Sequence, residues 1–429
     1  MVVLRKIVSL LLPLAVVFVI ASTQIFYLLS AIHQPDTAAL DESLYSRSTW
    51  NFAASSFDGN PYLEAIMNLT DQTLDRLSCP PIGVPPNRYN HLKVTRHEKS
   101  FWGGRRSPAI KYFFAINLFQ CKDVLPTMLG AVVEAIRFLG PENCALSIVE
   151  GRSTDGTFEI VAGLREEIEK LGVHYYLVRN DTDPKSGKID RIHALAGLRN
   201  QALRPLIRHS ELYNINTLII FVNDITLCAD DLLEMLHQQI VQSAVMTCAM
   251  DWKDTNGVMA FYDLWIARGI NGDIFYEVPQ DVQWSVKPAY ADNLFWNDRS
   301  TRAKLDKREP FQVYSCWNGV VVFSAEPILK GILFRGATEL ECTMGEPTLF
   351  CKDLWRNGYG KIQVVPTVNV AYEVDQGERA KTLYGRVGDY VDQTSMEDDT
   401  VPVHWQLQPP GMIKCVSQKW RDWSWGPSV

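Results

Sequence analysis

The stretch that decides the fold is Leu218-Ile219-Ile220-Phe221-Val222-Asn223-Asp224, in which an apolar run leads directly into an amide and a carboxylate. A short apolar run rich in β-branched and aromatic residues predicts a strand buried on both faces of a parallel sheet. Open α/β sheets bind their ligands at the carboxyl ends of such strands. Asn223 and Asp224 are therefore expected at a functional edge.

Three similar runs precede this strand, at residues 112–118, 146–149 and 174–178. Between them, apolar residues recur every three or four positions over 125–139 and 158–171, which is the pattern of amphipathic helices. Strands that alternate with helices pair in parallel through crossover connections. The chain is therefore predicted to be an α/β protein with an open, mostly parallel sheet flanked by helices.

The composition excludes two classes of protein. The 429 residues include 42 basic and 49 acidic ones, and no long basic run, so clustered cations for binding nucleic acid are missing. The 9 cysteines form no Cys-x-x-Cys pair and show none of the spacing of a zinc module. Because their number is odd, at least one thiol stays unpaired within the monomer. The pairing of the others depends on the cellular compartment.

The N-terminus predicts a membrane anchor. Residues 7–32 contain no charged side chain, and as a helix they would rise about 39 Å, enough to cross a bilayer core of about 30 Å. Arg5 and Lys6 precede this run and acidic residues follow it, so residues 1–6 are expected as a cytosolic tail in a type II topology. A cleaved signal peptide is the alternative.

The rest of the chain divides by composition. Residues 33–105 are rich in Pro, Ser and Asn and poor in apolar periodicity, which is typical of a lumenal stem. Residues 106–385 are expected to form the main domain, and 386–429 a C-terminal extension that packs back on it. The glycosylation sequons at Asn68 and Asn180 are usable only in a secretory lumen.

Polar residues follow the first, second and fourth strands. Ser153 and Asp155 lie before a predicted helix, where they either cap it or bind the base and ribose of a nucleotide. Asn117 and Glu150, at the ends of the first two strands, are predicted to bind the nucleotide donor together with them. Arg191, Arg199 and Asn200 interrupt the apolar stripe of a helix predicted at 188–203. They suit a diphosphate, although a solvated helix face is the alternative.

The carboxylates after the fourth strand predict a metal site. Asp224 lies where the apolar strand opens to solvent, and Asp230 and Asp231 follow it. A divalent ion there would bridge the diphosphate of a sugar nucleotide. The alternative is that Asp230 or Asp231 only caps a helix at 232–240. His404 is a further candidate ligand, if the C-terminus folds back to this edge.

Several motifs follow one another in a fixed order along the chain. They are the segments 195–206, Phe221-Val222-Asn223-Asp224-Ile225, Cys248-Ala249-Met250-Asp251-Trp252, 261–268, Ser315-Cys316-Trp317-Asn318-Gly319, 351–355 and Val365-Pro366. A tail element with Trp405, Pro409, Pro410 and Cys415 comes after them. This ordered set, over about residues 110–375 and the tail element, resembles the fungal cryptococcal-type α-1,3-mannosyltransferases, the capsule-associated group that forms glycosyltransferase family 69.

The resemblance implies a Rossmann-like fold of the GT-A type in a Golgi membrane protein with a lumenal catalytic domain. It implies GDP-mannose as donor, Mn²⁺ or Mg²⁺ as cofactor and a mannose-containing glycan as acceptor, joined through an α-1,3 linkage with retention. Asp224 takes the place of the metal motif. Because Asn223-Asp224-Ile225 lacks a full Asp-x-Asp pair, the second ligand stays open between Asn223 and Asp230.

The resemblance also suggests the residues around the reacting sugar. Asp251 and Glu346 are the carboxylates expected near the reacting carbon, although Glu346 in a helix first turn is explained equally well by the helix dipole. Gly269 stands where the family usually has an acidic residue. The expected acceptor-binding residues are Tyr262, Asp263, Trp265, Arg268, Trp317 and Asn318.

Two other functions remain open at this point. The incomplete metal motif and Gly269 are compatible with a non-catalytic glycan-binding or assembly factor on the same fold. The sequence also does not name the donor base or sugar, so a transferase that uses a different sugar nucleotide, such as a UDP-sugar, is the second alternative.

Overall fold

The computed structural model describes residues 57–82, 87–94, 110–277, 292–339, 341–342, 344–395, 400–416 and 423–429. All of them belong to one compact unit, residues 54–429. The predicted cytosolic tail at 1–6, the predicted membrane span at 7–32 and the first part of the predicted stem lie outside the described residues. Within the described part of the chain, no helix combines the length and the apolar character that a bilayer crossing requires.

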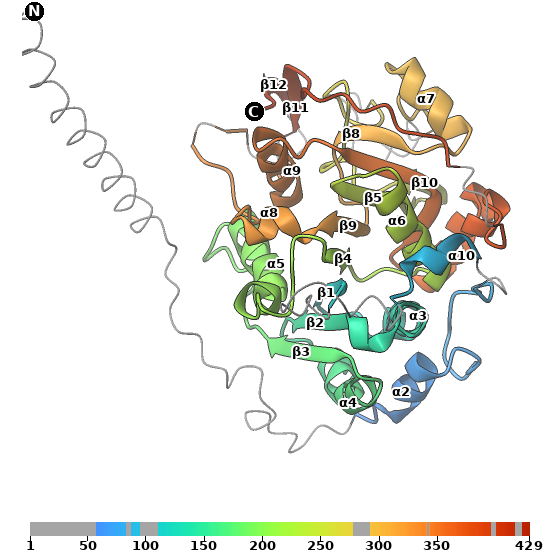
Figure 1. Ribbon diagram of the computed structural model, residues 1–429. Coiled ribbons are helices and arrows are strands. Elements are labelled where there is room, and N and C mark those ends of the chain that lie inside the picture. The colour runs from blue at the N-terminus through green and yellow to red at the C-terminus, as the bar shows by residue number, and fades with distance from the viewer. Residues whose placement is uncertain are drawn as a thin grey trace, which may run out of the picture. The chain divides into compact units, whose positions relative to one another are not determined.

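The first half of this unit alternates strands and helices, as the apolar runs predicted (Figure 1). Its last helix, predicted at 188–203, differs at both ends. It starts at Arg191, because the Asp190 side chain caps it by accepting from the backbone N–H groups of Ile192 and His193, and it ends at Arg208. The elements are β1 (Tyr112–Leu118), η5 (Lys122–Val124), α3 (Leu125–Leu139), η6 (Pro141–Asn143), β2 (Cys144–Glu150), α4 (Thr157–Lys170), β3 (His174–Arg179), α5 (Arg191–Arg208) and β4 (Leu218–Val222).

These strands pair in parallel in the order β3-β2-β1-β4. The carboxyl ends of β1, β2 and β4 therefore meet at one edge of the sheet. α5 packs on β1 and β2 and also contacts α9, whereas α3 contacts α6. All strand positions of β2 and β4 are buried, which agrees with the uninterrupted apolar runs in the sequence.

The second half of the unit extends the same sheet in the order β9-β5-β10-β8-β7, with β6 paired to β5. Its elements are α6 (Ala229–Val241), β5 (Met246–Thr255), β6 (Val258–Phe261), β7 (Arg268–Gly269), α7 (Arg299–Asp306), β8 (Phe311–Ser315), β9 (Val320–Ser324), α8 (Ala325–Leu329), α9 (Glu346–Arg356), β10 (Ile362–Ala371), α10 (Val374–Tyr384) and η8 (Val387–Asp389).

The prediction of a mostly parallel sheet is wrong for this second half. β9 lies antiparallel between β4 and β5, and β6 and β8 also pair antiparallel. β5 and β6 are joined by Asn256-Gly257, both with positive φ, which is the turn that two antiparallel strands use. Asn318 and Gly319, with φ of 52° and 80°, lead the chain into β9 without a crossover helix. The sheet is therefore mixed.

Segments from both ends of the unit pack on this core. Within the predicted stem, α2 (Asn60–Met67) contacts α3 and α4, and η3 (Asn87–Leu92) contacts α6. A disulfide joins Cys79 to Cys228 at the start of α6. At the other end, β11 (Met412–Val416) and β12 (Trp423–Pro427) form a hairpin, which a Cys342–Cys415 disulfide ties to the main domain.

Candidate active site

The candidate active site lies at the carboxyl edge of the sheet, where β4 and β5 end. Asn223 and Asp224 directly follow β4, and Asp251 lies in β5. Because β9 runs between these strands in the opposite direction, its first residues lie at the same edge. The Asn223 backbone N–H donates to the Gly319 carbonyl at 2.9 Å, just before β9. The fold thus gathers three chain segments at the predicted functional edge.

Arg199 contacts three other predicted site residues. Its Nε atom donates to Glu346 Oε1 at 2.8 Å, and its Nη1 atom donates to Asn223 Oδ1 at 3.5 Å. The guanidinium lies 4.2 Å from the ring centroid of Trp317, whose Nε1 atom also donates to Asn223 Oδ1, at 3.1 Å. α5 and α9 therefore meet through a largely buried ion pair. The first-turn position of Glu346 in α9 is also confirmed.

Asp251, which is buried, and Asp263, which is half-buried, form a carboxyl pair. The Asp263 backbone N–H donates to Asp251 Oδ1 at 3.2 Å, and the Tyr372 hydroxyl donates to Asp251 Oδ2 at 2.7 Å. The Asn318 backbone N–H donates to Asp263 Oδ2 at 2.9 Å. Burial, and then the charge of Asp263, raises the pKa of Asp251 well above its usual value, and burial raises the pKa of Asp263 to about 6. Both carboxyl groups therefore hold protons more tightly than in water.

The Asp224 carboxylate is the one best placed to bind a metal ion. It is half-buried and forms no hydrogen bond or ion pair with another of the described residues. Burial raises the pKa of Asp224, while the charges of Arg199 and Lys253 lower it. Mg²⁺-type sites use one or two carboxylates and complete their shell with phosphate oxygens and water. A single carboxylate at this edge fits that arrangement.

The structure does not support Asp230 as the second metal ligand. Among the described residues, Cys228, Asp230 and Asp231 are the group with ligand atoms within 4.8 Å of one another. The Cys228 sulfur is already in a disulfide, and Asp231 pairs with Lys381 and caps α6. Asp230 accepts from Gln393 Nε2 at 3.0 Å. The helix-capping alternative is therefore confirmed for Asp231. The Asp230 carboxylate is bonded to Gln393 and lies in this cluster rather than beside Asp224.

The prediction that His404 folds back to the metal edge is wrong. Its neighbours Val403 and Trp405 both bond to Gln242, at the end of α6 that lies away from Asp224. His404 itself is exposed there. The extended segment follows the outside of the domain, and no local pattern in the sequence showed which edge it reaches.

The predicted donor residues after β1 and β2 do lie together. Ser153 donates its backbone N–H to Glu150 Oε1 at 2.8 Å and accepts from the Gln120 backbone at 2.9 Å. Asp155 accepts at 3.0 Å from the first backbone N–H of α4, so its capping role is present. Asn117 Oδ1 and Glu150 Oε2 are buried without a hydrogen-bond partner among the described residues. Glu150 Oε2 pairs with Arg179 Nε at 3.7 Å, so of these two oxygens Asn117 Oδ1 is the one left for a ligand.

The two remaining donor candidates on α5 differ. Arg191 is exposed at the start of the helix, and its charge lowers the pKa of Tyr262, which burial raises overall. It therefore lies near the site. Asn200 instead exchanges two hydrogen bonds with the backbone of Phe334, at 2.8 and 3.0 Å. Its amide fixes a loop, so the prediction that it faces a diphosphate is not supported.

Four of the predicted acceptor residues serve the fold instead. Trp317 and Asn318 are fully buried, and their side chains bond to Asn223 and to the Ala249 carbonyl. Arg268 is fully buried and donates to the carbonyls of Leu264, Ala267 and Lys414, and burial lowers its pKa to about 10. Trp265 donates its Nε1–H to the Val416 carbonyl at 3.0 Å. Arg268 and Trp265 hold the C-terminal hairpin, and the charge of Arg268 also lowers the pKa of Asp263, which burial raises overall.

Tyr262 and Gly269, by contrast, can be placed relative to the site. Tyr262 is exposed, and its ring centroid lies 4.7 Å from that of Tyr372. It therefore lies next to the carboxyl pair, because Tyr372 donates to Asp251. Gly269 ends β7, where its N–H donates to the Asp273 carbonyl and an added Cβ would meet Asn271. The departure from the family pattern thus lies beside the hairpin rather than among the site carboxylates.

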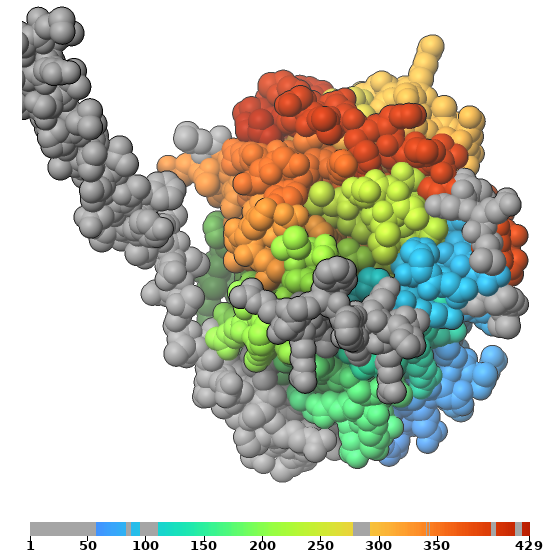
Figure 2. Space-filling view, viewed as in Figure 1, coloured from blue at the N-terminus to red at the C-terminus, as the bar shows by residue number. Residues whose placement is uncertain are grey.

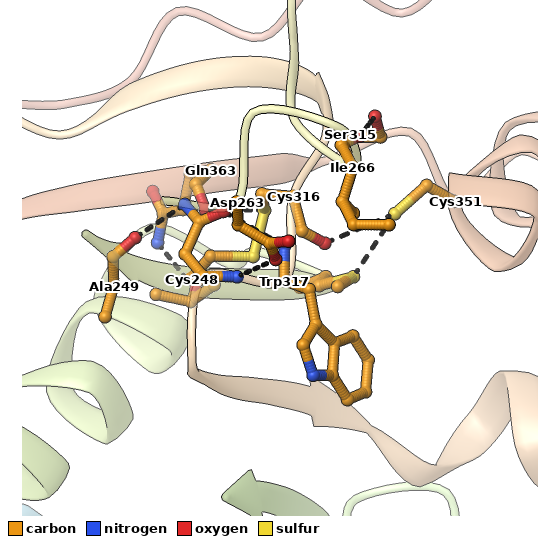
Figure 3. The surroundings of a disulfide bond; sticks show 12 residues. Cys248, Ala249, Asp263, Ile266, Ser315, Cys316, Trp317, Cys351 and Gln363 are labelled. Carbon is orange, nitrogen blue, oxygen red and sulfur yellow. Dashed lines mark hydrogen bonds between the residues drawn. A yellow bond between two sulfur atoms is a disulfide. The ribbon is translucent and has the colours of Figure 1, made fainter. Parts of the chain in front are cut away.

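A disulfide lies beside Asp263 of the carboxyl pair (Figure 3). Cys248 of β5 forms a disulfide with Cys316. Asn318 follows two residues later, and its side-chain amide donates to the Ala249 carbonyl at 2.7 Å. The free thiol of Cys351 contacts the Cys316 carbonyl at 3.8 Å. Burial raises the pKa of Cys351 to about 12, so the thiolate that would attack the disulfide is scarce. The disulfide therefore fixes Asn318 against β5.

The sequence reasoning missed two residues of the site, Tyr372 and Lys253. Tyr372 follows the apolar strand β10 in the same way that Asn223 follows β4, so the same signal would have found it. Lys253 lies two positions after Asp251 in β5 and therefore on the same face of the strand. Its Nζ atom lies 4.9 Å from the ring centroid of Tyr262.

Comparisons with known proteins agree on one family. The family described as "Cryptococcal mannosyltransferase 1" matches residues 111–353. An α-1,3-mannosyltransferase of Cryptococcus neoformans is 33% identical over 372 residues, which are 82% of this chain and 78% of that protein.

Solved structures give a weaker likeness. TarS of S. aureus (residues 1–349) is 14% identical with a TM-score of 0.36, over 62% of this chain and 60% of its own. A mannosyltransferase of Pyrobaculum calidifontis, solved with GDP-Man and Mn²⁺, is 13% identical with a TM-score of 0.35, over 67% and 63% of the two chains. The chain thus spans less than two thirds of these solved structures.

The family match covers more than half of the chain, and it includes β4, β5, the carboxyl pair and the first turn of α9. The identity to the cryptococcal relative extends over most of both proteins. The site residues Arg199, Asp224 and Asp263 all fall inside the matched range. On this evidence from sequence and site together, the chain belongs to the cryptococcal mannosyltransferase 1 family.

Proposed function

We propose that this protein transfers mannose from GDP-mannose to a mannose-containing glycan and forms an α-1,3 linkage with retention of configuration, in a reaction that depends on Mn²⁺ or Mg²⁺. Its fold is then of the GT-A type. The observation that carries the proposal is family membership combined with an available carboxylate, Asp224, at the carboxyl edge of the sheet.

The donor diphosphate would lie at this edge. Asp224 would hold the divalent ion, which when bound neutralises charge on the departing diphosphate. The Arg199 guanidinium, adjacent to Asn223, adds positive charge on the protein side. Asn117 Oδ1, which is buried without a hydrogen-bond partner among the described residues, suits an N–H or O–H donor of the nucleoside.

The protein mainly positions the reactants. An acceptor hydroxyl oxygen bonds to the anomeric carbon while the bond from that carbon to the diphosphate breaks, and the hydroxyl proton moves to the departing phosphate oxygen on the same face. No protein nucleophile is required by this route. Asp263 can orient the acceptor hydroxyl, because it is half-buried and its Oδ1 atom forms no hydrogen bond with another of the described residues. Both oxygens of the fully buried Asp251 already accept hydrogen bonds, so Asp251 holds Asp263 and Tyr372 in place.

We also propose that the protein acts in the Golgi lumen, anchored through residues 7–32 in a type II topology. Three disulfides support an oxidising compartment, because disulfides are rare in the cytosol. The exposed sequon at Asn68 is also compatible with a lumenal location.

A donor panel tests the proposed function. Purified full-length protein is incubated with GDP-mannose or UDP-sugars and a mannose oligosaccharide, with and without Mn²⁺. We expect transfer from GDP-mannose only, lost with chelator. Asp224→Asn should abolish metal-dependent turnover, because an amide keeps the shape but not the charge. Asp306→Asn, at an exposed position on α7, is the matched control.

Each alternative has its own outcome in this panel. Transfer from a UDP-sugar would overturn the donor assignment. Glycan binding without consumption of any donor would identify a non-catalytic protein. Unchanged turnover of Asp224→Asn at limiting Mn²⁺ would place the metal elsewhere.

A further inference from the structure

Three tryptophans gather around Lys414, outside the carboxylate site. Trp423 and Trp425 lie two residues apart on β12, and Trp425 pairs with Lys414 of β11, so these side chains share one face of the hairpin. The Lys414 Nζ atom lies 5.0 Å from the ring centroid of Trp423, 6.0 Å from that of Trp425 and 5.8 Å from that of Trp296. It also pairs with Asp273 at 2.9 Å.

This cluster is presented at the surface rather than buried in the core. Trp425 is 49% exposed, and Trp423 and Trp296 are half-buried. Figure 2 shows the red C-terminal residues at the surface, on the side that also carries the gold residues of α7. Cation–π contacts with a lysine that is itself fixed by a carboxylate hold the rings in place. Grouped exposed aromatic rings of this kind mark binding surfaces.

Amide groups lie directly beside the rings. Asn271 Nδ2 donates to Asn297 Oδ1, and Asn297 Nδ2 donates to Asp273 Oδ2, each at 2.9 Å. Both asparagines are exposed, so each has donors and acceptors left for a ligand. A pyranose presents C–H faces that stack on aromatic rings and hydroxyl edges that need hydrogen-bond partners. Rings with a rim of amides therefore suit a sugar better than a purely apolar partner.

The cluster is connected to the candidate active site. Arg268 Nε donates to the Lys414 carbonyl at 2.7 Å, and Trp265 Nε1 donates to the Val416 carbonyl at 3.0 Å. The turn at Gly272 packs so closely that an added Cβ would lie 2.1 Å from the Met412 carbonyl oxygen. The segment that holds the hairpin contains Trp265 and Arg268, and it follows Asp263 of the carboxyl pair directly in the chain. A glycan longer than one sugar could extend from the site along it.

We propose that Trp296, Trp423 and Trp425, here called the aromatic platform, bind mannose units of the glycan acceptor beyond the unit that reacts. This inference rests on the proposed function, because that function supplies the class of ligand. The platform is a second binding surface, separate from the carboxylates, and it would favour long acceptors over short ones.

Binding is tested without any donor. Purified full-length protein is run in native gels that contain soluble mannan, and its retardation is measured. Trp425→Ala should weaken mannan binding about 5- to 10-fold, the effect of losing one aromatic stack. Trp425→Phe, which keeps a ring, should lose less. Leu407→Ala removes an apolar side chain that is 75% exposed but lies outside the platform, and it should change nothing.

Kinetics give a second and independent readout. For the parent protein, KM should fall as the mannose oligosaccharide lengthens from two to six units. In Trp425→Ala this dependence on length should disappear, while kcat, the KM for GDP-mannose and the KM for the disaccharide stay unchanged. A misfolded variant would lose kcat as well. Trp425→Phe is the folding control, because it keeps an aromatic ring at this position and should keep kcat.

The outcomes separate this inference from the proposed function. Equal mannan retardation for the parent and Trp425→Ala would overturn the platform and leave the transferase proposal intact. Loss of binding to phosphatidylcholine vesicles in Trp425→Ala, with mannan binding unchanged, would show a membrane contact and also overturn it. Platform-dependent mannan binding without donor consumption would support the platform while overturning the proposed transfer.

Discussion

At the scale of single residues, Arg199 combines two contacts that a lysine cannot make together. Its guanidinium donates to Glu346 and also lies over the ring of Trp317. A planar guanidinium can do both, because its donors lie in the plane and its faces stay free to stack. Arg199 therefore organises the site as well as adding charge to it.

We expect Arg199→Lys to weaken GDP-mannose binding in the presence of Mn²⁺ by about 1–3 kcal/mol and to leave acceptor binding unchanged. The reason is that a lysine keeps the charge but loses the planar fork. Calorimetric titration measures this effect, with Arg204→Lys on the same helix as the control. Donor affinity equal to that of the parent would show that Arg199 serves only the contact between α5 and α9.

The carboxyl pair predicts a pH dependence of stability. Burial raises the pKa of Asp263 to about 6, above the value of about 3.9 in an unfolded chain. Between these values the folded protein holds a proton that the unfolded chain has released. Unfolding therefore releases a proton, and this contribution to stability is present below pH 4 and is lost as the pH rises towards 6.

Asp263→Asn removes this titration while keeping an oxygen that accepts from Asn318. From pH 4 to 6.5, the free energy of unfolding of the parent should fall by about 1–3 kcal/mol more than that of the variant. Urea unfolding at several pH values measures the difference. The carboxylates outside the pair cancel in it, whereas loss of the Asp263 charge also lowers the pKa of Asp251. Parallel curves for the two proteins would contradict the proton-holding state of Asp263.

At the scale of elements, the short connection between β8 and β9 carries much of the site. Trp317 and Asn318 lie in it, and the Cys248–Cys316 disulfide ties its start to β5 across 68 residues of sequence. Its geometry depends on this link, because no helix or strand covers the four residues between Ser315 and Val320.

Replacing both Cys248 and Cys316 by alanine should therefore lower the free energy of unfolding by about 2–4 kcal/mol. It should also raise the KM for the acceptor, because Asn318 positions Asp263. Cys144→Ala is the control, since this buried free thiol lies in β2, away from the connection. If both variants lost the same stability with unchanged KM, the disulfide would have no particular role at the site.

At the scale of the whole molecule, the two sequons differ in their surroundings. Asn68 is exposed after α2, whereas Asn180 is half-buried and its amide nitrogen donates to Gln201. N-glycosylation joins the sugar to that amide nitrogen, so only Asn68 presents a free one. The proposed lumenal location would bring it to the modifying machinery.

We expect the full-length protein, expressed in a yeast secretory pathway, to carry a glycan at Asn68. Endoglycosidase treatment should increase its gel mobility, and Asn68→Gln should remove this shift while Asn180→Gln keeps it. An unchanged mobility for the parent protein would argue against the lumenal location. A shift lost only with Asn180→Gln would contradict the accessibility argument.

The sequence by itself determined the alternating strands and helices from Tyr112 to Val222 and the position of Asp224 at a strand end. Hydrophobic period and strand-end polarity are local, so they can be read without the fold. It did not determine the partners of these elements. Arg199 and Glu346 are 147 residues apart, and Asp251 and Tyr372 are 121 apart.

Only the tertiary structure decided which carboxylates share the site. The antiparallel insertion of β9 between β4 and β5 brings Asn318 to Asp263, and the same packing leaves His404 at the other edge. Periodicity shows that a face is buried, but not what covers it, because many apolar surfaces can cover the same strand. The partner is selected by packing over the whole sheet, which no segment of the sequence contains alone.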